Sequence, residues 1–99
     1  MSRGIDRERR LRDLLYADGW WTARAAGSLG DADVVALRAG ATPRLIEVKS
    51  TTRGPYHGFG PARRIALRAA AHKAGAEAWL VWWPLRAQPK WISSEDWPA

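Results

Sequence analysis

Apolar and polar positions along the chain follow two different periods, and these periods predict where helices and strands lie. Residues 5–17 are rich in helix formers, and their isoleucine and leucines can form one apolar stripe, which predicts a helix. Gly19 ends it, and residues 20–24 (Trp-Trp-Thr-Ala-Arg) predict a first strand of aromatic and β-favouring residues. Residues 25–32, which contain two glycines and a serine, are expected to form a loop.

The clearest pattern is a pair of short apolar runs on either side of a turn. Residues 33–38 (Asp-Val-Val-Ala-Leu-Arg) and 44–49 (Arg-Leu-Ile-Glu-Val-Lys) flank residues 39–43, which include Gly40 and Ala41. This arrangement predicts a β-hairpin that folds about these two residues.

The second half of the chain predicts a long loop, a helix and two strands. Residues 50–60 contain glycines and a proline, and a loop of this length is usually functional or mobile. Pro61 can occupy the first turn of a helix that runs to about Ala74. Residues 79–83 (Trp-Leu-Val-Trp-Trp) predict a strand that Pro84 ends, and residues 90–92 a last short one.

The helix of residues 61–74 is rich in alanine, so it can lie close against a sheet. We expect Ile65, Ala69 and His72 to share the stripe that packs there, while Arg64 and Arg68 lie on a different stripe. The predicted order is α-β-β-β-α-β-β, in a single α/β domain covering residues 1–99.

Charge and composition narrow the choice of partner. The chain has 16 Lys and Arg against 10 Asp and Glu, and 13 of the 16 are arginine. Because the guanidinium group binds phosphate oxygens bidentately, this excess favours nucleic acid. No apolar run is long enough to span a bilayer and the N-terminus is too charged for a signal peptide, so we expect a cytoplasmic protein. Without cysteine, a metal would need carboxylate or imidazole ligands.

Three charged residues converge at one end of the predicted hairpin. An antiparallel register places Asp33 opposite Glu47 or Val48, and alternation sends Glu47 and Lys49 to the same face. Two adjacent carboxylates repel unless a cation lies between them, and hard oxygen ligands suit Mg²⁺ or Mn²⁺. Val48 would add its backbone carbonyl, and Lys49 could orient or deprotonate the attacking water. The alternative is that Asp33 caps the loop while Glu47 and Lys49 are ordinary solvent-facing charges.

Glu8 is a further carboxylate on the stripe of the first helix that should face the sheet. Its structural alternative is a salt bridge to Arg12, four residues along the helix.

The first half of the chain carries an ordered set of motifs: Gly4-Ile5-Asp6-Arg7-Glu8-Arg9, Leu11, Leu14-Leu15, Gly19-Trp20, Arg24-Ala25-Ala26-Gly27-Ser28, Asp33-Val34-Val35-Ala36 and Ile46-Glu47-Val48-Lys49. In this set the chain resembles the archaeal-type Holliday junction resolvases of the PD-(D/E)xK nuclease superfamily. After Lys49 only Tyr56, an alanine-rich helix and a tryptophan-bearing strand fit in a general way.

The resemblance implies a restriction-endonuclease-like mixed central sheet flanked by helices. It also implies an endonuclease that depends on Mg²⁺, with Mn²⁺ as a substitute, and that cuts four-way DNA junctions without a nucleotide cofactor. It implies that the active site consists of Glu8, Ser28, Asp33, Glu47 and Lys49. Ala32 stands where the superfamily often has proline, and Asp31 is a competing acid two residues before Asp33. Ser28 would position phosphate or water; without the resemblance it is a turn residue.

The remaining basic and aromatic residues are candidate DNA contacts. The predicted set is Arg3, Arg9, Arg24, Arg53, Tyr56, His57, Arg63, Arg64 and Arg68. A solvated helix face explains Arg63, Arg64 and Arg68 equally well, and a lone loop histidine such as His57 is more often only solvated.

A homodimer is expected because a four-way junction is near two-fold symmetric and needs two cuts. The last quarter of the chain also carries Trp79, Trp82, Trp83, Trp91 and Trp97, more rings than we expect one small sheet to cover. Two alternatives remain open: another nuclease of the superfamily, restriction-like or acting on single strands, and a non-catalytic DNA-binding module.

Overall fold

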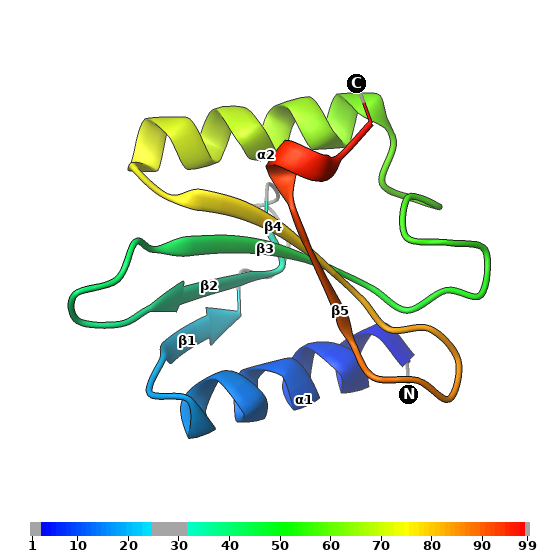
Figure 1. Ribbon diagram of the computed structural model, residues 1–99, viewed down its shortest axis with the longest axis horizontal. Helices are drawn as coiled ribbons and strands as arrows, with labels where there is room; N and C mark the ends of the chain where they lie inside the picture. The colour runs from blue at the N-terminus through cyan, green and yellow to red at the C-terminus, as the bar shows by residue number, and fades with distance from the viewer. Residues whose placement is uncertain (1–2, 25–31, 99) are drawn as a thin grey trace.

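In the computed structural model, residues 3–24 and 32–98 are described, the side chains from residue 6 onward. One mixed sheet is flanked by a helix on each face (Figure 1). The elements are, in chain order, α1 (Arg3–Ala17), β1 (Trp21–Arg24), β2 (Val34–Leu37), β3 (Arg44–Lys49), α2 (Pro61–Ala74), β4 (Glu77–Trp82), β5 (Lys90–Ser93) and a 3₁₀ turn (Ser94–Asp96). The predicted fold class and element order are confirmed.

The strands lie in the sheet in their chain order, β1-β2-β3-β4-β5. Each strand runs antiparallel to the next except β3 and β4, which are parallel and joined through α2. The central strand is therefore β3, and its carboxyl end lies beside the carboxyl end of β4. None of the described helices is long and apolar enough to cross a membrane.

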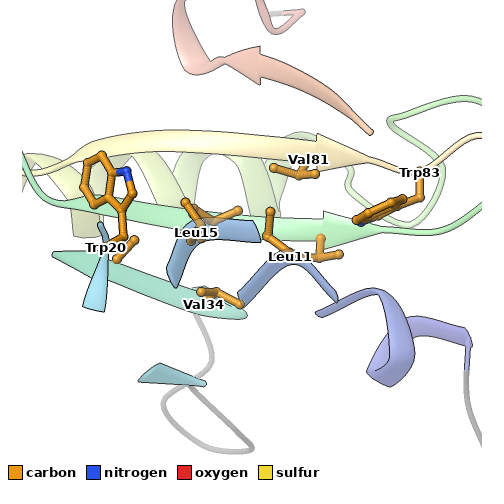
Figure 2. Close-up of a cluster of buried hydrophobic side chains, with 9 residues drawn as sticks. Leu11, Leu15, Trp20, Val34, Val81 and Trp83 are labelled. Carbon is orange, nitrogen blue, oxygen red and sulfur yellow. The ribbon is translucent and has the colours of Figure 1, made fainter. Parts of the chain in front are cut away.

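The core on the α1 side forms where the helix lays its leucines on the sheet. Leu11 and Leu15 pack with Trp20 against alternate residues of the strands, among them Val34 and Val81 (Figure 2). Gly19 ends the helix with φ 86°, a conformation that glycine adopts without strain, and so turns the chain directly into β1.

The expected sheet-facing stripe of α2 is wrong. Ile65 is 64% exposed, and Ala69 and His72 also face solvent. The buried face instead consists of Arg64, Leu67 and Ala71. Arg64 occupies a core position because its guanidinium donates to the carbonyl of Phe59 (2.7 Å) while its stem is buried. Because one residue of the buried face is charged, the apolar pattern did not indicate which face of α2 packs on the sheet.

Of the tryptophans in the last quarter, two are buried within the fold and three keep part of their surface exposed. Trp83 and Trp97 are 4% and 5% exposed, and Trp79, Trp82 and Trp91 are partly buried. Trp79 and Trp91 pack on Arg44, whose guanidinium also lies over Trp20. None of the five is strongly exposed, and their place in a dimer interface stays a prediction.

Candidate active site

Asp33 lies immediately before β2, at the end of the hairpin. Val34 pairs with Ile46, so the next pair outward is Asp33 with Glu47, as the spacing predicted. The backbone N–H of Asp33 donates to the carbonyl of Ile46 (2.9 Å), and its carboxylate accepts a hydrogen bond from the N–H of Val48 (2.8 Å). Asp33 therefore caps a free strand N–H and still keeps a carboxylate oxygen for another partner.

Glu47 is almost fully buried, with 1% of its surface exposed. Its neighbours Ile46 and Val48 point into the core under α1, so strand alternation directs Glu47 to the α2 face. There its two carboxylate oxygens accept from two cations, Lys49 Nζ at 3.1 Å and Arg63 Nη2 at 2.9 Å.

The electrostatic balance at Glu47 still disfavours the charged form. Burial, followed by the neighbouring charge of Asp33, raises the pKa of the Glu47 carboxyl above its ordinary value of 4.5. Lys49 and Arg63 oppose this shift without cancelling it. A further cation between the two carboxylates would therefore be favourable.

Lys49 is held on the same face as Glu47, which confirms the predicted alternation. Gly58, from the loop before α2, lies directly over it: a Cβ built on Gly58 would be 3.6 Å from Lys49 Nζ. Gly58 has φ 78°, which disfavours any side chain at this point. Because Gly58 has no side chain, the loop backbone lies close to Lys49 while the ammonium group stays partly exposed.

The donor set at this end of β3 fits a hard cation. In an extended strand the N–H and C=O of one residue point to the same edge, so the carbonyl of Val48 faces the edge at which Asp33 binds its N–H. Asp33 and Glu47 supply carboxylate oxygens and Val48 a carbonyl oxygen, which are ligands that Mg²⁺ accepts. Within the described residues no group of three or more His, Cys, Asp or Glu side chains is placed to bind a metal.

Comparison with known proteins identifies the family. Residues 1–96 match the family described as archaeal Holliday junction resolvase (hjc). The chain belongs to this family. A solved relative is Hjc of Archaeoglobus fulgidus, a Holliday junction resolvase from an archaeal hyperthermophile: it is 30% identical, with a TM-score of 0.83 over 95% of this chain and 75% of that one. No curated protein sequence matches the chain.

Membership of the resolvase family confirms the resemblance drawn from the first half of the chain and extends it to the second half. The fold of the A. fulgidus resolvase likewise agrees with the restriction-endonuclease-like architecture that the resemblance implied.

Glu8 faces β1 and does not join the two hairpin carboxylates in a cluster. It pairs with Arg24 at 2.7 Å, and its side chain is largely buried. The salt bridge to Arg12 considered as an alternative is wrong, because Arg12 donates to the hydroxyl of Thr22 in β1. Glu8 thus links α1 to the strand that leads into residues 25–31.

The other candidate DNA contacts differ in the solvent exposure of their side chains. Ser28, the competing Asp31 and the side chain of Arg3 lie outside the described part of the structure. Arg9, Arg53 and His57 are exposed, as the DNA-binding prediction requires, and Tyr56 is partly buried.

Arg64 and Arg68 do not suit the DNA contacts predicted for them. Arg64 is only 6% exposed. Arg68 donates to the carbonyl of Ser94 (2.7 Å) and lies over the ring of Trp97. Both guanidinium groups serve the packing of α2 on the sheet.

Arg63 has a role that the sequence did not reveal. It was expected to contact DNA, but the structure brings it onto Glu47 from the first turn of α2. In the sequence, Arg63 stands just after the loop that follows Lys49. Its contact with Glu47 could be inferred from this position only if the path of that loop were known.

Proposed function

We propose that this member of the resolvase family cuts four-way DNA junctions by Mg²⁺-dependent hydrolysis of phosphodiester bonds. One observation carries the proposal: Asp33, buried Glu47 and Lys49 come together at the carboxyl end of the central strand. A buried acid with a raised pKa beside a second carboxylate lowers the stability of the fold, so stability alone does not explain this pair. Such a pair is expected at a site that binds a cation.

Asp33, Glu47 and the carbonyl of Val48 would hold the Mg²⁺, with Mn²⁺ as a substitute. When bound, the ion would polarise the scissile phosphate and lower the pKa of a bound water. Glu8, on its own side of α1, is proposed to orient water and not to bind the metal directly, because its carboxylate is held by Arg24.

Lys49 and Arg63 supply the positive charge that the reaction needs at the phosphate. Lys49 Nζ, held by Glu47 and covered by Gly58, would orient the attacking water or stabilise charge that develops on the phosphate oxygens. Arg63 is half exposed, so it can leave Glu47 and reach a phosphate oxygen. Lys49 would act from its present position, whereas Arg63 would move from Glu47 to the phosphate.

We further propose that the active form is a homodimer. A four-way junction has near two-fold symmetry, and two opposed cuts require two sites related by the same symmetry. Sedimentation at micromolar concentration tests this: an 11 kDa species alone, with and without junction DNA, would refute the dimer.

The deciding experiment compares a labelled four-way junction with a linear duplex of the same sequence, with Mg²⁺ or EDTA and without nucleotide. The proposal predicts cleavage of the junction only, only with Mg²⁺, and none by Asp33→Asn. Equal cleavage of the linear duplex would contradict the substrate assignment, and cleavage in EDTA would contradict the role of the metal. Junction binding should also weaken steeply with salt, since phosphate contacts dominate it.

A further inference from the structure

A basic cavity of about 340 Å³ lies between the N-terminal half of α1 and the loop that joins β4 to β5. Figure 1 shows both elements at the end of the sheet where the loop after β3 begins. The cavity is lined by Arg7, Arg10, Trp83, Arg86, Ala87 and Gln88. No acidic residue is among these, so every charged residue of the lining is an arginine.

The three arginines of this cavity differ from the four arginines that form ion pairs elsewhere in the described residues. Arg24, Arg38, Arg44 and Arg63 each pair with a carboxylate. In the part of the chain that the structure describes, the cavity arginines form no such pair: the guanidinium groups of Arg7 and Arg10 lie over the ring of Trp83 instead, at 5.1 and 5.4 Å. Like charges gathered without a counter-charge favour an anion.

Two buried donors at the cavity also have no acceptor. Arg7 Nε and the indole Nε1 of Trp83 are buried and have no hydrogen-bond partner within the described residues. Buried N–H groups are normally satisfied, so each such exception calls for a physical reason. At the rim, Arg86 holds φ 58°, a left-handed conformation that a residue other than glycine rarely adopts. Both donor atoms lack solvent contact, so an anion in the cavity would supply their acceptors only after a small movement of the Arg7 and Trp83 side chains.

The cavity also lies next to the candidate active site. The backbone N–H of Trp83 donates to the carbonyl of Lys49 at 2.8 Å. The ring of Trp83 packs on the α1 side of the sheet, whereas the side chain of Lys49 lies with Glu47 on the α2 side. A ligand in the cavity would therefore lie at the catalytic end of β3, on the opposite face from the hydrolytic groups.

We propose that Arg7, Arg10 and Arg86 form a subsite for a backbone phosphate of junction DNA, separate from the phosphate being cut. This inference rests on the proposed function, because it takes the DNA as already bound at Asp33 and Glu47. The subsite would fix the direction in which one arm of the junction leaves the active site, through phosphate contacts that carry no sequence information.

The test measures binding to a fluorescent four-way junction by anisotropy in EDTA, at several salt concentrations between about 50 and 200 mM. The variants are Arg10→Gln and Arg86→Asn, where asparagine suits the left-handed backbone. Lys73→Gln is the control, since it removes one charge from the exposed last turn of α2. Melting temperatures verify that each variant folds.

Each cavity variant should lower the slope of log affinity against log salt by about 0.9, which corresponds to about an eightfold loss of affinity at 0.1 M salt. Lys73→Gln should leave the slope unchanged. Junctions with single methylphosphonate linkages should identify one position that weakens binding by wild type but adds nothing to the loss in Arg10→Gln.

Other outcomes distinguish a failure of the proposed subsite from a failure of the proposed function. If wild type binds and cuts the junction while the cavity variants lose no more than Lys73→Gln, the subsite is wrong and the function stands. If wild type neither binds nor cuts the junction, the function itself fails. If inorganic phosphate alone raises the melting temperature of wild type but not of Arg10→Gln, and no methylphosphonate position matters, the cavity binds free phosphate and the DNA subsite is refuted.

Discussion

Replacing Glu47 by glutamine should separate the stability of the protein from its activity. Glu47 is buried with a raised pKa, so its ionised form destabilises the folded state. Glutamine has nearly the same size, keeps an oxygen that can accept from Lys49 or Arg63, and carries no charge to repel Asp33. Without metal, Glu47→Gln should therefore unfold at a higher temperature than wild type at neutral pH.

The pH dependence follows from the direction of the shift. Below the ordinary pKa of 4.5 the carboxyl is protonated in both the folded and the unfolded chain, so the two proteins should differ little. As the pH rises from 4.5 through the raised pKa of the folded state, only the wild type loses stability, because ionisation is less favourable in its folded form. The advantage of Glu47→Gln in EDTA should grow over this range and then level off.

Mg²⁺ should stabilise wild type relative to Glu47→Gln, because only wild type keeps both carboxylate ligands. At tenfold excess over its dissociation constant, a ligand bound only by the folded form stabilises it by about 1.4 kcal/mol, or roughly 6–11 °C for a domain of this size. Wild type should show this rise and Glu47→Gln should not, while cleavage by the variant falls on the order of a thousandfold or more. Thermal melts with and without Mg²⁺ measure the first effect and single-turnover cleavage the second. An equal Mg²⁺ shift in both proteins, or near-normal cleavage by the variant, would refute the assignment of Glu47 as a ligand.

Three further changes test other parts of the site. Asp33→Asn should abolish cleavage but keep junction binding and a near-normal melting temperature, because the amide oxygen can still accept from Val48; cleavage within tenfold of wild type would exclude Asp33 as a ligand. Glu8→Gln should cost less than about 1 kcal/mol in denaturant melts, since the bond to Arg24 is partly exposed, yet remove most cleavage; full activity would leave Glu8 a purely structural role. Arg64→Ala should lower the free energy of unfolding by about 2–4 kcal/mol, because it leaves a cavity and removes a buried charge-assisted hydrogen bond; a melting temperature like that of wild type would contradict its place in the core.

The hairpin half of the site could be predicted because its geometry is local. The spacing of Asp33, Glu47 and Lys49 about one turn fixes their register, and strand alternation fixes their face. Arg63 could not be placed in this way, since it reaches Glu47 only after the chain has crossed over the sheet through residues 50–60.

The helix faces were predicted less well because apolar periodicity does not show which polar residues become buried. Arg64 lies in the core through a bond to the carbonyl of Phe59, which no pattern in α2 reveals. Glu8 was placed on a sheet-facing stripe correctly, but its partner Arg24 comes from a different element and not from the same helix. For both Arg64 and Glu8, contacts with other elements of the fold determine the structural role of the charged group.

The chain order of the sheet has a consequence for how the protein folds. Pairs β1–β2, β2–β3 and β4–β5 join neighbours in sequence, so most of the sheet can form through short-range closures, which are fast. The parallel pair β3–β4 is the exception, because its strands are joined by the long crossover that contains α2. The two cations of Glu47 therefore arrive at different stages, Lys49 with its own strand and Arg63 only with the crossover. Before α2 packs, its face of the sheet is open to water, so Glu47 becomes buried and gains Arg63 in the same closure.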